Sequence, residues 1–540
     1  MKAILTTLAL MGTATLALAQ GKATVMEDVN HVVDNTPDSI AKALMSRPTP
    51  GSTRREGKPV LFLIGNSTMR NGTRGDGSNG QWGWGYYAPK YFDYSQISVE
   101  NQALGGMSTR TFYTKLWPDI RQAIQPGDWV IVSIGHNDGG PIDEGRARSV
   151  LSGTGQDSVV VTIKETGVRE TVYTYGGYMR RYIADIRARG AHPVLMSLTP
   201  RNAYDPQTCR IVRKPQGAWL QTIADEQNVP YIDLNEISGA KLDRFGPWKE
   251  AYHFYKDNIH TSKFGAELNA RSAAEGIAAC KHEGIRELQQ MLTNVEPQQV
   301  PVERRKGKPV VFITGDSTVK NEDRDDDSMW GWGAVAEQVF NTKKITVANC
   351  AKAGRSTRTY LNEGRWDQVY NSLQPGDFVL IQFGHNDIGP IEKDRMRGVI
   401  PGVQEEPKVY KMEKTGDYEL VYCFGFYLKK FIMDVREKGA TPIIVSLTPR
   451  NEWKDGRIER RNDTYGRWYR QVCQETQTEL VDLHNLTADA LEQTCHSKEE
   501  AAPYYKRDHT HTSKRGAMLN AQNVAKGLKA NHSPLAKYLK

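Results

Sequence analysis

The chain has 540 residues, of which 39% are hydrophobic and 9% aromatic, and its formal net charge is +8 at pH 7. The length predicts about two to four domains, and the composition excludes the disordered and fibrous classes. Dense basic runs are absent, which argues against nucleic-acid binding, and the modest charge fits a weak preference for acidic partners such as uronic-acid polysaccharides.

The N-terminus has the pattern of a secretory signal peptide over residues 1–19. Lys2 supplies a positive charge, residues 3–19 are small and apolar, and Ala17-Leu18-Ala19 matches a cleavage site before Gln20. No later stretch of the sequence is long and apolar enough to form a membrane span. We therefore expect an exported protein, periplasmic or extracellular.

Two long segments of the chain repeat each other. KPVLFLIGNST returns as KPVVFITGDST, QWGWG as MWGWG, NQALGGMSTRT as NCAKAGRSTRT, PGDWVIVSIGHNDGGPI as PGDFVLIQFGHNDIGPI, GAHPVLMSLTPRN as GATPIIVSLTPRN, and DNIHTSKFGAELNA as DHTHTSKRGAMLNA. The small drift in spacing indicates two copies of one whole domain rather than a solenoid. We expect an extension and linker over 20–57, a first domain over 58–284, a linker over 285–306 and a second domain over 307–540.

Apolar runs alternate with amphipathic stretches in both copies. Strands are expected at 60–64, 129–134, 193–198 and 229–234, and again at 310–314, 378–383, 442–447 and 479–483. YGGYMRRYIADIRARG and FGFYLKKFIMDVREKG have helical spacing and end at Gly. The alternation predicts an α/β fold with mostly parallel sheets and helices on both faces. An inserted β-hairpin is expected within 143–172 and within 392–421.

The six cysteines are too few for a disulfide scaffold, and their spacing leaves any pairing open. Neither a CxxC nor an HExxH spacing occurs, so we expect no metal and no cofactor. The sequence sets no oligomeric state.

A serine follows the first expected strand of each copy. The strands end at Gly65 and Gly315, where the lack of a side chain allows a sharp turn, and Ser67 and Ser317 lie two residues further on. Open α/β sheets place their chemistry at the carboxyl ends of the strands, which makes these serines candidate nucleophiles. Each also fits an ordinary turn between a strand and a helix.

Groups that would activate a serine also occur twice. Asp257 and His260, then Asp508 and His511, lie three residues apart before a TSKxG helix start. At this spacing, the carboxylate can reach the ring of a His that acts as base. In the alternative interpretation, these residues only cap the last helix.

Candidate oxyanion groups lie at other strand ends. Asn137 and Asn386, in GHND, follow strands directly and can donate a side-chain N–H, although an Asx turn explains them equally well. Gly106 and Gly354 follow NQALG and NCAKA, where a glycine lets the backbone N–H approach a substrate oxygen; the alternative is a plain turn glycine.

These blocks, in this order, resemble the SGNH (GDSL-type) hydrolases. The motifs GDST, WGWG, NxAxxGxSxR(S/T) and TPRN resemble those of the carbohydrate esterases that include rhamnogalacturonan acetylesterases. This resemblance extends over 58–280 and 308–530. The resemblance implies two tandem three-layer α/β/α, flavodoxin-like domains and metal-free hydrolysis through an acyl-enzyme. It also implies the roles of the matching residues: nucleophiles Ser67 and Ser317, bases His260 and His511, orienting carboxylates Asp257 and Asp508, and oxyanion groups Gly106, Asn137, Gly354 and Asn386 with each serine's backbone N–H.

The copies differ beside these residues. The second copy has Asp316 before its serine, where the first copy has Asn66. In the block that reads NQALGGMSTRT or NCAKAGRSTRT, the second copy has Arg355 where the first has Met107. EGRW (363–366) is replaced by KLWP (115–118) in the first copy. The second copy is therefore closer to the family pattern, but the first keeps every implied catalytic residue type, so we expect both to be active.

Four further residues are candidates for substrate contacts. Arg110 and Arg358, in STRT, match a uronate carboxylate bidentately, or they form structural salt bridges with a neighbouring loop. Trp84 and Trp332, in WGWG, stack on sugar rings in one interpretation and pack under the nucleophile loop in the other.

Together, these patterns predict a secreted esterase that removes acetyl groups from plant cell-wall polysaccharide, with pectic rhamnogalacturonan the first candidate. One alternative is a lipase or thioesterase of the same superfamily. Another is a catalytic second domain joined to a non-catalytic, sugar-binding first copy. The acetylated position recognised is not encoded in any of these motifs.

Overall fold

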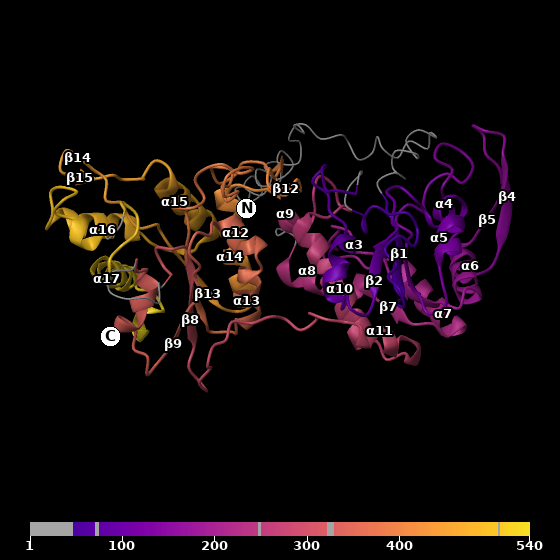
Figure 1. Ribbon diagram of the computed structural model, residues 1–540, viewed down its shortest axis with the longest axis horizontal. Coiled ribbons are helices and arrows are strands. Elements are labelled where there is room, and N and C mark those ends of the chain that lie inside the picture. Colours follow the sequence, from indigo (N-terminus) through magenta and orange to yellow (C-terminus); the bar gives the residue numbers. More distant parts are fainter. Residues whose placement is uncertain (1–46, 71–74, 247–249, 321–328, 506–507) are drawn as a thin grey trace, which may run out of the picture. The chain divides into compact units, whose positions relative to one another are not determined.

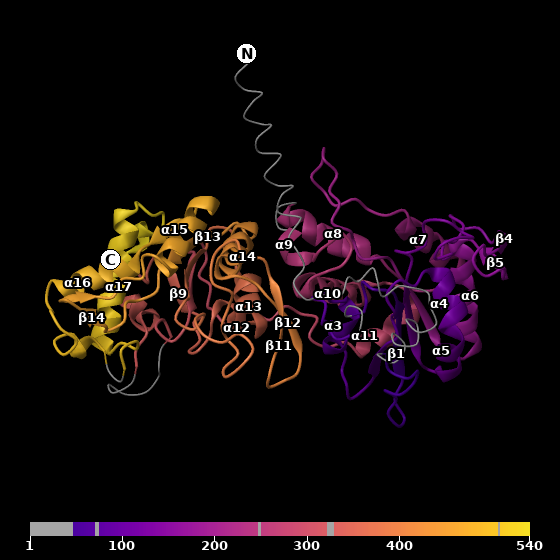
Figure 2. The same ribbon diagram turned by 90° about the horizontal axis from the view of Figure 1, so that it is seen from above.

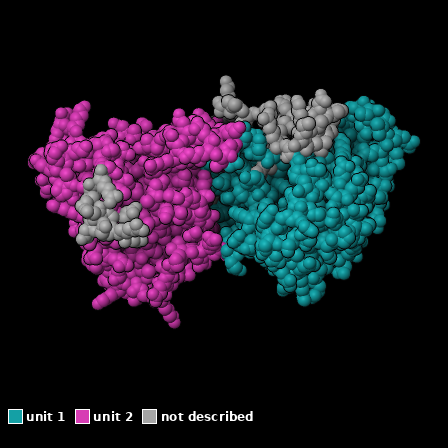
Figure 3. All heavy atoms as spheres, viewed as in Figure 1, with its two compact units in different colours: residues 1–296, 417–420 teal, residues 297–416, 421–540 magenta. Residues whose placement is uncertain are grey.

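The computed structural model describes residues 47–540 except 71–74, 247–249, 321–328 and 506–507. The expected signal peptide at 1–19 and most of the expected extension lie outside the described residues. The chain divides into two compact units, residues 1–296 with 417–420 (unit 1) and residues 297–416 with 421–540 (unit 2) (Figure 3).

Each unit contains a five-stranded parallel sheet. In unit 1, the strand order is β2-β1-β3-β6-β7, formed by Ser98–Asn101, Val60–Gly65, Trp129–Ser133, His192–Met196 and Tyr231–Ile232. In unit 2, the order is β9-β8-β10-β13-β16, formed by Thr346–Asn349, Val310–Gly315, Phe378–Gln382, Thr441–Val445 and Glu479–Val481. This is the flavodoxin-like order, and the predicted fold class is confirmed.

Helices cover both faces of the unit 1 sheet. Leu61, Leu63 and Ile131 pack against one helical layer, whereas their neighbours Phe62 and Val130 face the other. Alternate strand residues thus enter two separate cores, which produces three layers. In Figures 1 and 2, α3 and α10 lie on one side of this sheet and α5 and α6 on the other. The helical segments are α3 (Trp84–Tyr87), η3 (Ala88–Tyr91), α4 (Thr109–Lys115), α5 (Trp117–Ala123), α6 (Tyr175–Ala188), α7 (Gln216–Gln227), α8 (Leu234–Phe245), α9 (Glu250–His253), α10 (Lys263–Ala279), η5 (Glu283–Ile285) and α11 (Arg286–Gln290).

Unit 2 repeats these layers. Ala517, Ala521 and Val524 pack on one face of its sheet, and α14 and α15 contact strands β13 and β16. The helical segments are η6 (Trp332–Gln338), α12 (Thr357–Asn362), α13 (Arg365–Ser372), α14 (Phe424–Glu437), α15 (Tyr465–Thr476), α16 (Leu483–Glu492), η7 (Ala502–Tyr504), α17 (Lys514–Ala530) and η8 (Ala536–Tyr538).

Some strands lie outside the sequence-based prediction. β2 and β9 have only four residues each, SVEN and TVAN, and pair along one side only. Short edge strands lack the apolar run that identifies a central strand, which explains the omission. The short pair β14 (Trp453–Lys454) and β15 (Arg457–Ile458) was also not predicted.

The expected insertions do contain paired strands. In unit 1, β4 (Ser158–Thr162) and β5 (Arg169–Tyr173) form an antiparallel hairpin. The corresponding segment of the second copy contains the two-stranded sheet of β11 (Lys408–Lys411) and β12 (Tyr418–Val421). All six cysteines are unpaired. Within the described ranges, no helix has the length and apolar character of a membrane span.

Candidate active site

The sharp turn after β1 brings Ser67 to its partners in unit 1. The Nε2 atom of His260 lies 2.8 Å from Ser67 Oγ, and its Nδ1 lies 2.6 Å from Asp257 Oδ2. The other carboxylate oxygen of Asp257 accepts the backbone N–H groups of Ile259 (2.8 Å) and His260 (2.7 Å). The three-residue spacing therefore forms a tight turn in which the carboxylate fixes both the backbone and the ring of His260.

Unit 2 contains the same constellation after β8. His511 Nε2 lies 2.9 Å from Ser317 Oγ, and His511 Nδ1 lies 2.7 Å from Asp508 Oδ2. The Oδ1 atom of Asp508 accepts the backbone N–H groups of Thr510 (2.7 Å) and His511 (2.8 Å). Two serines almost half the chain apart thus have matching environments.

The electrostatics of the two aspartates fix the tautomer of each histidine. Burial raises the pKa of Asp257 and Asp508, but hydrogen bonds from the adjacent histidine and turn outweigh it, leaving both lowered, Asp508 to about 2. Each Asp is therefore ionised at neutral pH and accepts Nδ1–H. The unprotonated Nε2 then faces the serine hydroxyl and can accept its proton.

Donors suited to an oxyanion surround each serine. The backbone N–H groups of Ser67 and Gly106 donate no hydrogen bond to any described residue, and Gly106 has φ +74°. The Nδ2 atom of Asn137 donates to the carbonyl oxygen of Met107 (3.1 Å), which leaves its second N–H available. Because these donors are fixed before a substrate arrives, they suit the stabilisation of a developing negative charge.

The corresponding groups of unit 2 have the same arrangement. Gly354 has φ +79°, and the backbone N–H groups of Gly354 and Ser317 donate to none of the residues described. Asn386 Nδ2 donates to the carbonyl oxygen of Arg355 at 3.1 Å. The structure therefore brings all the predicted triad and oxyanion residues together, once in each unit.

A buried aspartate joins the two oxyanion loops in each unit. The carboxylate of Asp138, next to Asn137, accepts the N–H (2.8 Å) and hydroxyl (2.6 Å) of Thr109, the first residue of α4. Asp387 accepts the same groups of Thr357 at 3.0 and 2.5 Å. Burial raises the pKa of Asp138 to about 6 and that of Asp387 to about 7.

Sequence reasoning missed an arginine at each oxyanion loop. Arg148 Nη1 donates to the carbonyl oxygen of Gly106 (3.0 Å), and Arg397 Nη1 donates to that of Gly354 (3.3 Å). Both side chains are partly exposed and come from the segment after GHND. The RxR patterns at 146–148 and 395–397 were the available signal.

The second tryptophan of each WGWG piece, Trp84 or Trp332, lies in the interior, which corrects its expected role in substrate stacking. Trp84 is 2% exposed and Trp332 is 0% exposed, and the indole N–H of Trp332 donates to Gln382 Oε1 (2.7 Å). Each ring belongs to the hydrophobic core below the nucleophile turn. The packing interpretation of these residues therefore holds.

The WGWG backbone instead joins the serine turn to the histidine turn. The N–H of Trp84 donates to the carbonyl oxygen of Thr68 (3.1 Å). The N–H of Trp82 donates to the carbonyl oxygen of Thr261 (2.9 Å), and the hydroxyl of Thr261 donates to the carbonyl oxygen of Trp82 (2.6 Å). A Cβ on Gly83 would lie 2.2 Å from the backbone of Met69, so only glycine permits this approach. Gly331 has the same constraint in unit 2.

The arginines of STRT are also buried, contrary to the expectation of a uronate contact. Arg110, 0% exposed, forms a bidentate ion pair with Glu170 (2.9 and 2.7 Å). Arg358, 1% exposed, donates to the carbonyl oxygens of Ile391 (3.1 Å) and Met396. Each fixes the inserted segment to a short helix, and neither guanidinium is accessible to a polysaccharide.

The TPRN block contributes a contact that the sequence did not indicate. The backbone N–H of Asn202 donates to the carbonyl oxygen of Asn258 (2.8 Å), and Asn451 donates to that of His509 (2.6 Å). Each acceptor lies between the Asp and the His of its unit, so the block holds the histidine turn against the sheet.

The differences between the copies preserve the geometry of the site. Asp316 Oδ1 accepts the N–H and hydroxyl of Thr318 (2.9 and 2.8 Å), and Asn66 Oδ1 accepts those of Thr68 (3.3 and 3.1 Å). An amide oxygen therefore replaces the carboxylate oxygen in the same turn.

The KLWP segment differs less from EGRW than its letters suggest. The indole N–H of Trp117 donates to Asp185 (2.8 Å), and that of Trp366 donates to Asp434 (2.8 Å). The tryptophan is thus shared, and the exposed ion pair of Arg355 with Glu363 (2.9 Å) is the feature specific to unit 2.

In the described part of the chain, no three His, Cys, Asp or Glu side chains group as metal ligands.

Comparisons with known proteins agree with this geometry. The family model described as "GDSL-like Lipase/Acylhydrolase family" matches residues 63–268 and 313–519. Rhamnogalacturonan acetylesterase of Emericella nidulans is 31% identical over 220 residues, 40% of this chain and 84% of its own length. Rhamnogalacturonan acetylesterase RhgT of Bacillus subtilis is 32% identical over 248 residues, 43% of this chain and 95% of its own.

Among solved structures, acetylxylan esterase Axe2 from Geobacillus stearothermophilus is similar, with 21% identity and a TM-score of 0.29, covering 41% of this chain and 94% of that one. The family model covers most of both units, and each unit contains the serine, glycine, asparagine and histidine of that family's motifs. The chain therefore belongs to the GDSL-like lipase/acylhydrolase family, of which it carries two tandem domains, and it is a carboxylic-ester hydrolase.

Proposed function

We propose that the protein is a carbohydrate esterase that removes O-acetyl groups from plant cell-wall polysaccharide, with rhamnogalacturonan as its first candidate substrate, and that both units are catalytic. The observation that carries this proposal is the complete Ser–His–Asp set with available oxyanion donors in each unit. The two relatives named rhamnogalacturonan acetylesterases, each about as long as one unit, support the substrate class.

In unit 1, Ser67 Oγ attacks the acetyl carbonyl carbon while His260 Nε2 accepts the hydroxyl proton. Asp257 stabilises the resulting imidazolium through the Nδ1 hydrogen bond (2.6 Å). The negative charge on the former carbonyl oxygen is stabilised by the N–H groups of Ser67, Gly106 and Asn137. Ser317, His511 and Asp508 perform the same steps in unit 2 with Gly354 and Asn386.

Collapse of the tetrahedral intermediate breaks the bond to the sugar oxygen, which leaves as a hydroxyl with the proton from the histidine. Water then attacks the acetyl-serine, with the same histidine accepting a proton from the water. Release of acetate restores the serine hydroxyl. Every proton is exchanged at the histidine Nε2, which explains why the backbone of each histidine turn is bound by two other blocks.

A catalytic unit 1 is favoured over a purely sugar-binding first copy. Asn66 keeps the hydrogen bonds that shape the serine turn, and the Ser67–His260 distance matches that of unit 2. Export by an N-terminal signal peptide remains part of this proposal, since an extracellular or periplasmic enzyme meets polymeric substrates.

The test compares the full-length protein with its Ser67→Ala and Ser317→Ala variants. Acetate release is measured on acetylated pectin and acetylated xylan, with 4-nitrophenyl esters of acetate and of a long-chain acid as comparison. We expect each single variant to retain the activity of its intact unit and to prefer acetyl esters. Preference for the long-chain ester would favour a lipase, and a Ser317→Ala variant without activity would favour a sugar-binding unit 1.

A further inference from the structure

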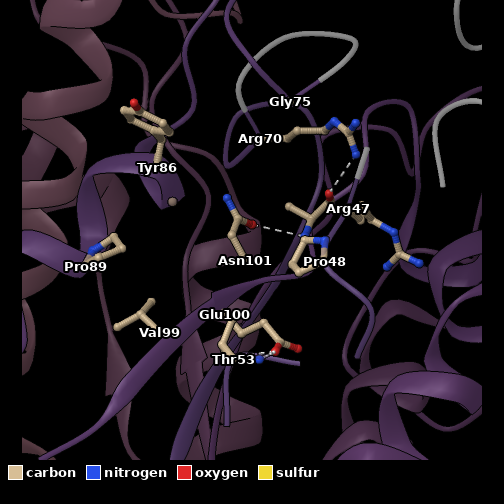
Figure 4. A pocket seen from close by; sticks show the side chains of 12 residues that line it. Arg47, Pro48, Thr53, Arg70, Gly75, Tyr86, Pro89, Val99, Glu100 and Asn101 are labelled. Atoms are coloured by element: carbon tan, nitrogen blue, oxygen red, sulfur yellow. Dashed lines mark hydrogen bonds between the residues drawn. The ribbon is translucent and has the colours of Figure 1, made fainter. Parts of the chain in front are cut away.

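Unit 1 contains a cavity of about 320 Å³ that none of the catalytic steps uses. Its lining includes Arg47, Arg70, Tyr86, Val99 and Asn101 (Figure 4). Its volume falls at the lower end of the range of small-molecule sites, about 300–1,000 Å³. The cavity lies beside the nucleophile turn in sequence, since Arg70 is three residues after Ser67.

The cavity combines two guanidinium groups. Arg47 Nη1 donates to the carbonyl oxygen (3.2 Å) and Oε1 (2.9 Å) of Gln102, while its buried Nε has no hydrogen-bond partner among the described residues. Burial lowers the pKa of Arg47 to about 10, and burial together with the charge of Arg47 lowers that of Arg70 to about 10. An anion between them would therefore relieve both desolvation and repulsion.

The acidic residue of the lining is already engaged. Glu100 is 0% exposed, and its carboxylate accepts hydrogen bonds from Gly51 (2.9 Å), from the N–H and hydroxyl of Thr53 (3.1 and 2.8 Å) and from Gln102 (2.8 Å). The charges of Asp119 and then of Glu100 raise the pKa of Arg47, but burial outweighs both and leaves it lowered. The lining thus contains two guanidinium groups against one carboxylate that four hydrogen bonds already engage.

The opposite wall is apolar. Tyr86 is 50% exposed, and its ring is held edge-on by Trp82 and Tyr87, with centroid distances of 5.2 and 5.1 Å. Figure 4 shows Tyr86, Pro89 and Val99 across Asn101 from the two arginines. A flat apolar wall facing guanidinium groups suits a ring that has one apolar face and one carboxylate.

We propose that this cavity binds a uronate residue, with the carboxylate on Arg47 and Arg70 and the sugar ring against Tyr86. The inference rests on the proposed function, because it makes the cavity an accessory subsite for an acidic polysaccharide. It is specific to unit 1: the positions matching Arg70, Tyr86 and Glu100 hold Lys320, Ala334 and Ala348. Unit 1 would thereby hold acidic stretches of polymer that unit 2 does not select.

The test measures binding of D-galacturonate, with D-galactose as the neutral comparison, by calorimetry on the full-length Ser67→Ala/Ser317→Ala protein. We expect galacturonate to bind, Arg47→Gln to weaken it at least tenfold and Tyr86→Ala to weaken it several-fold. Arg169→Gln, an exposed arginine on β5, is the matched control and should bind as its parent does. Tyr86→Ala keeps the test decisive if Arg47→Gln fails to fold.

Equal affinity in the parent, Arg47→Gln and Tyr86→Ala proteins would overturn the proposal, as would equal binding of galactose. Acetate or sulfate binding as tightly as galacturonate would overturn the assignment of a sugar. Acetate release by the wild-type protein separates this inference from the proposed function. Release without Arg47-dependent binding overturns only the subsite, whereas Arg47-dependent binding without release overturns only the esterase.

Discussion

Units 1 and 2 reach one active-site geometry with different residues beside it. The serine–histidine distances are 2.8 and 2.9 Å, although Asn66 stands in one nucleophile turn and Asp316 in the other. In both turns, a side-chain oxygen accepts the N–H and hydroxyl of the threonine two residues on. The turn thus requires an acceptor at this position, whereas the charge of a carboxylate is an additional property of unit 2.

The largest expected effect tests whether both units contribute. Removing both nucleophiles, in Ser67→Ala/Ser317→Ala, should lower kcat for acetate release by at least about 10⁴-fold, because neither unit can then form an acyl-enzyme. The rates of the two single variants should add up to the wild-type rate at saturating substrate. A double variant that retains more than about one per cent of the activity would contradict the assignment of these serines.

The oxyanion asparagines come next. Asn137→Ala in a Ser317→Ala background, and Asn386→Ala in a Ser67→Ala background, should each lower kcat about 10²–10³-fold, since one donor to the oxyanion is lost. KM should change little. Unequal losses in the two units would show that their oxyanion holes are not equivalent, despite matching 3.1 Å contacts of the two amides.

A smaller effect is expected at the arginines that bind the glycine loops. Arg148→Gln and Arg397→Gln, each with the other unit's serine removed, should lower kcat about tenfold, consistent with the loss of one charge-assisted hydrogen bond. As positioning residues, they should leave KM nearly unchanged, and Arg→Lys should restore part of the rate. A higher KM with unchanged kcat would instead indicate direct contact with the substrate.

The smallest effect concerns the pH dependence of stability. Burial raises the pKa of Asp316, and burial followed by the charge of Asp316 raises that of Asp387 to about 7. The folded unit 2 retains the proton of Asp387 up to about pH 7, whereas the unfolded chain releases it from about pH 4 upward. The stability of unit 2 should therefore fall as the pH rises from about 4 to about 7 and level off above that. Unit 1 has Asp138, with a pKa of about 6, and an uncharged Asn66.

Scanning calorimetry of the full-length protein between pH 4 and 8 tests this difference. Asp316→Asn should reduce the pH dependence of the unit 2 transition, and Asn66→Asp should increase that of unit 1. Each kcal/mol changes the Tm of a domain of this size by about 2–4 °C. Unchanged pH profiles in both variants would show that these buried side chains have the same protonation in the folded and unfolded states.

Much of the fold and site could be predicted because it depends on order along the chain. The repeated blocks predicted two parallel α/β sheets. Ser67 and Asn137 directly after strands, and His260 just before the last helix, were predicted to supply one catalytic site at the carboxyl ends of the strands. Parallel strands bring their carboxyl ends to the same side, so residues far apart in sequence converge there. Short strands at the edges, such as β2, carry no apolar run and were missed.

The sequence by itself determined the family, the duplication and the chemical types available to each site. Only the tertiary structure decided which polar and aromatic side chains face a substrate. Arg110 and Arg358 are buried, as are Trp84 and Trp332, whereas Arg148 and Arg397 reach the oxyanion loops. The physical reason is that an arginine or tryptophan is equally able to fill an interior position or a binding site, and burial depends on neighbours that are distant in sequence.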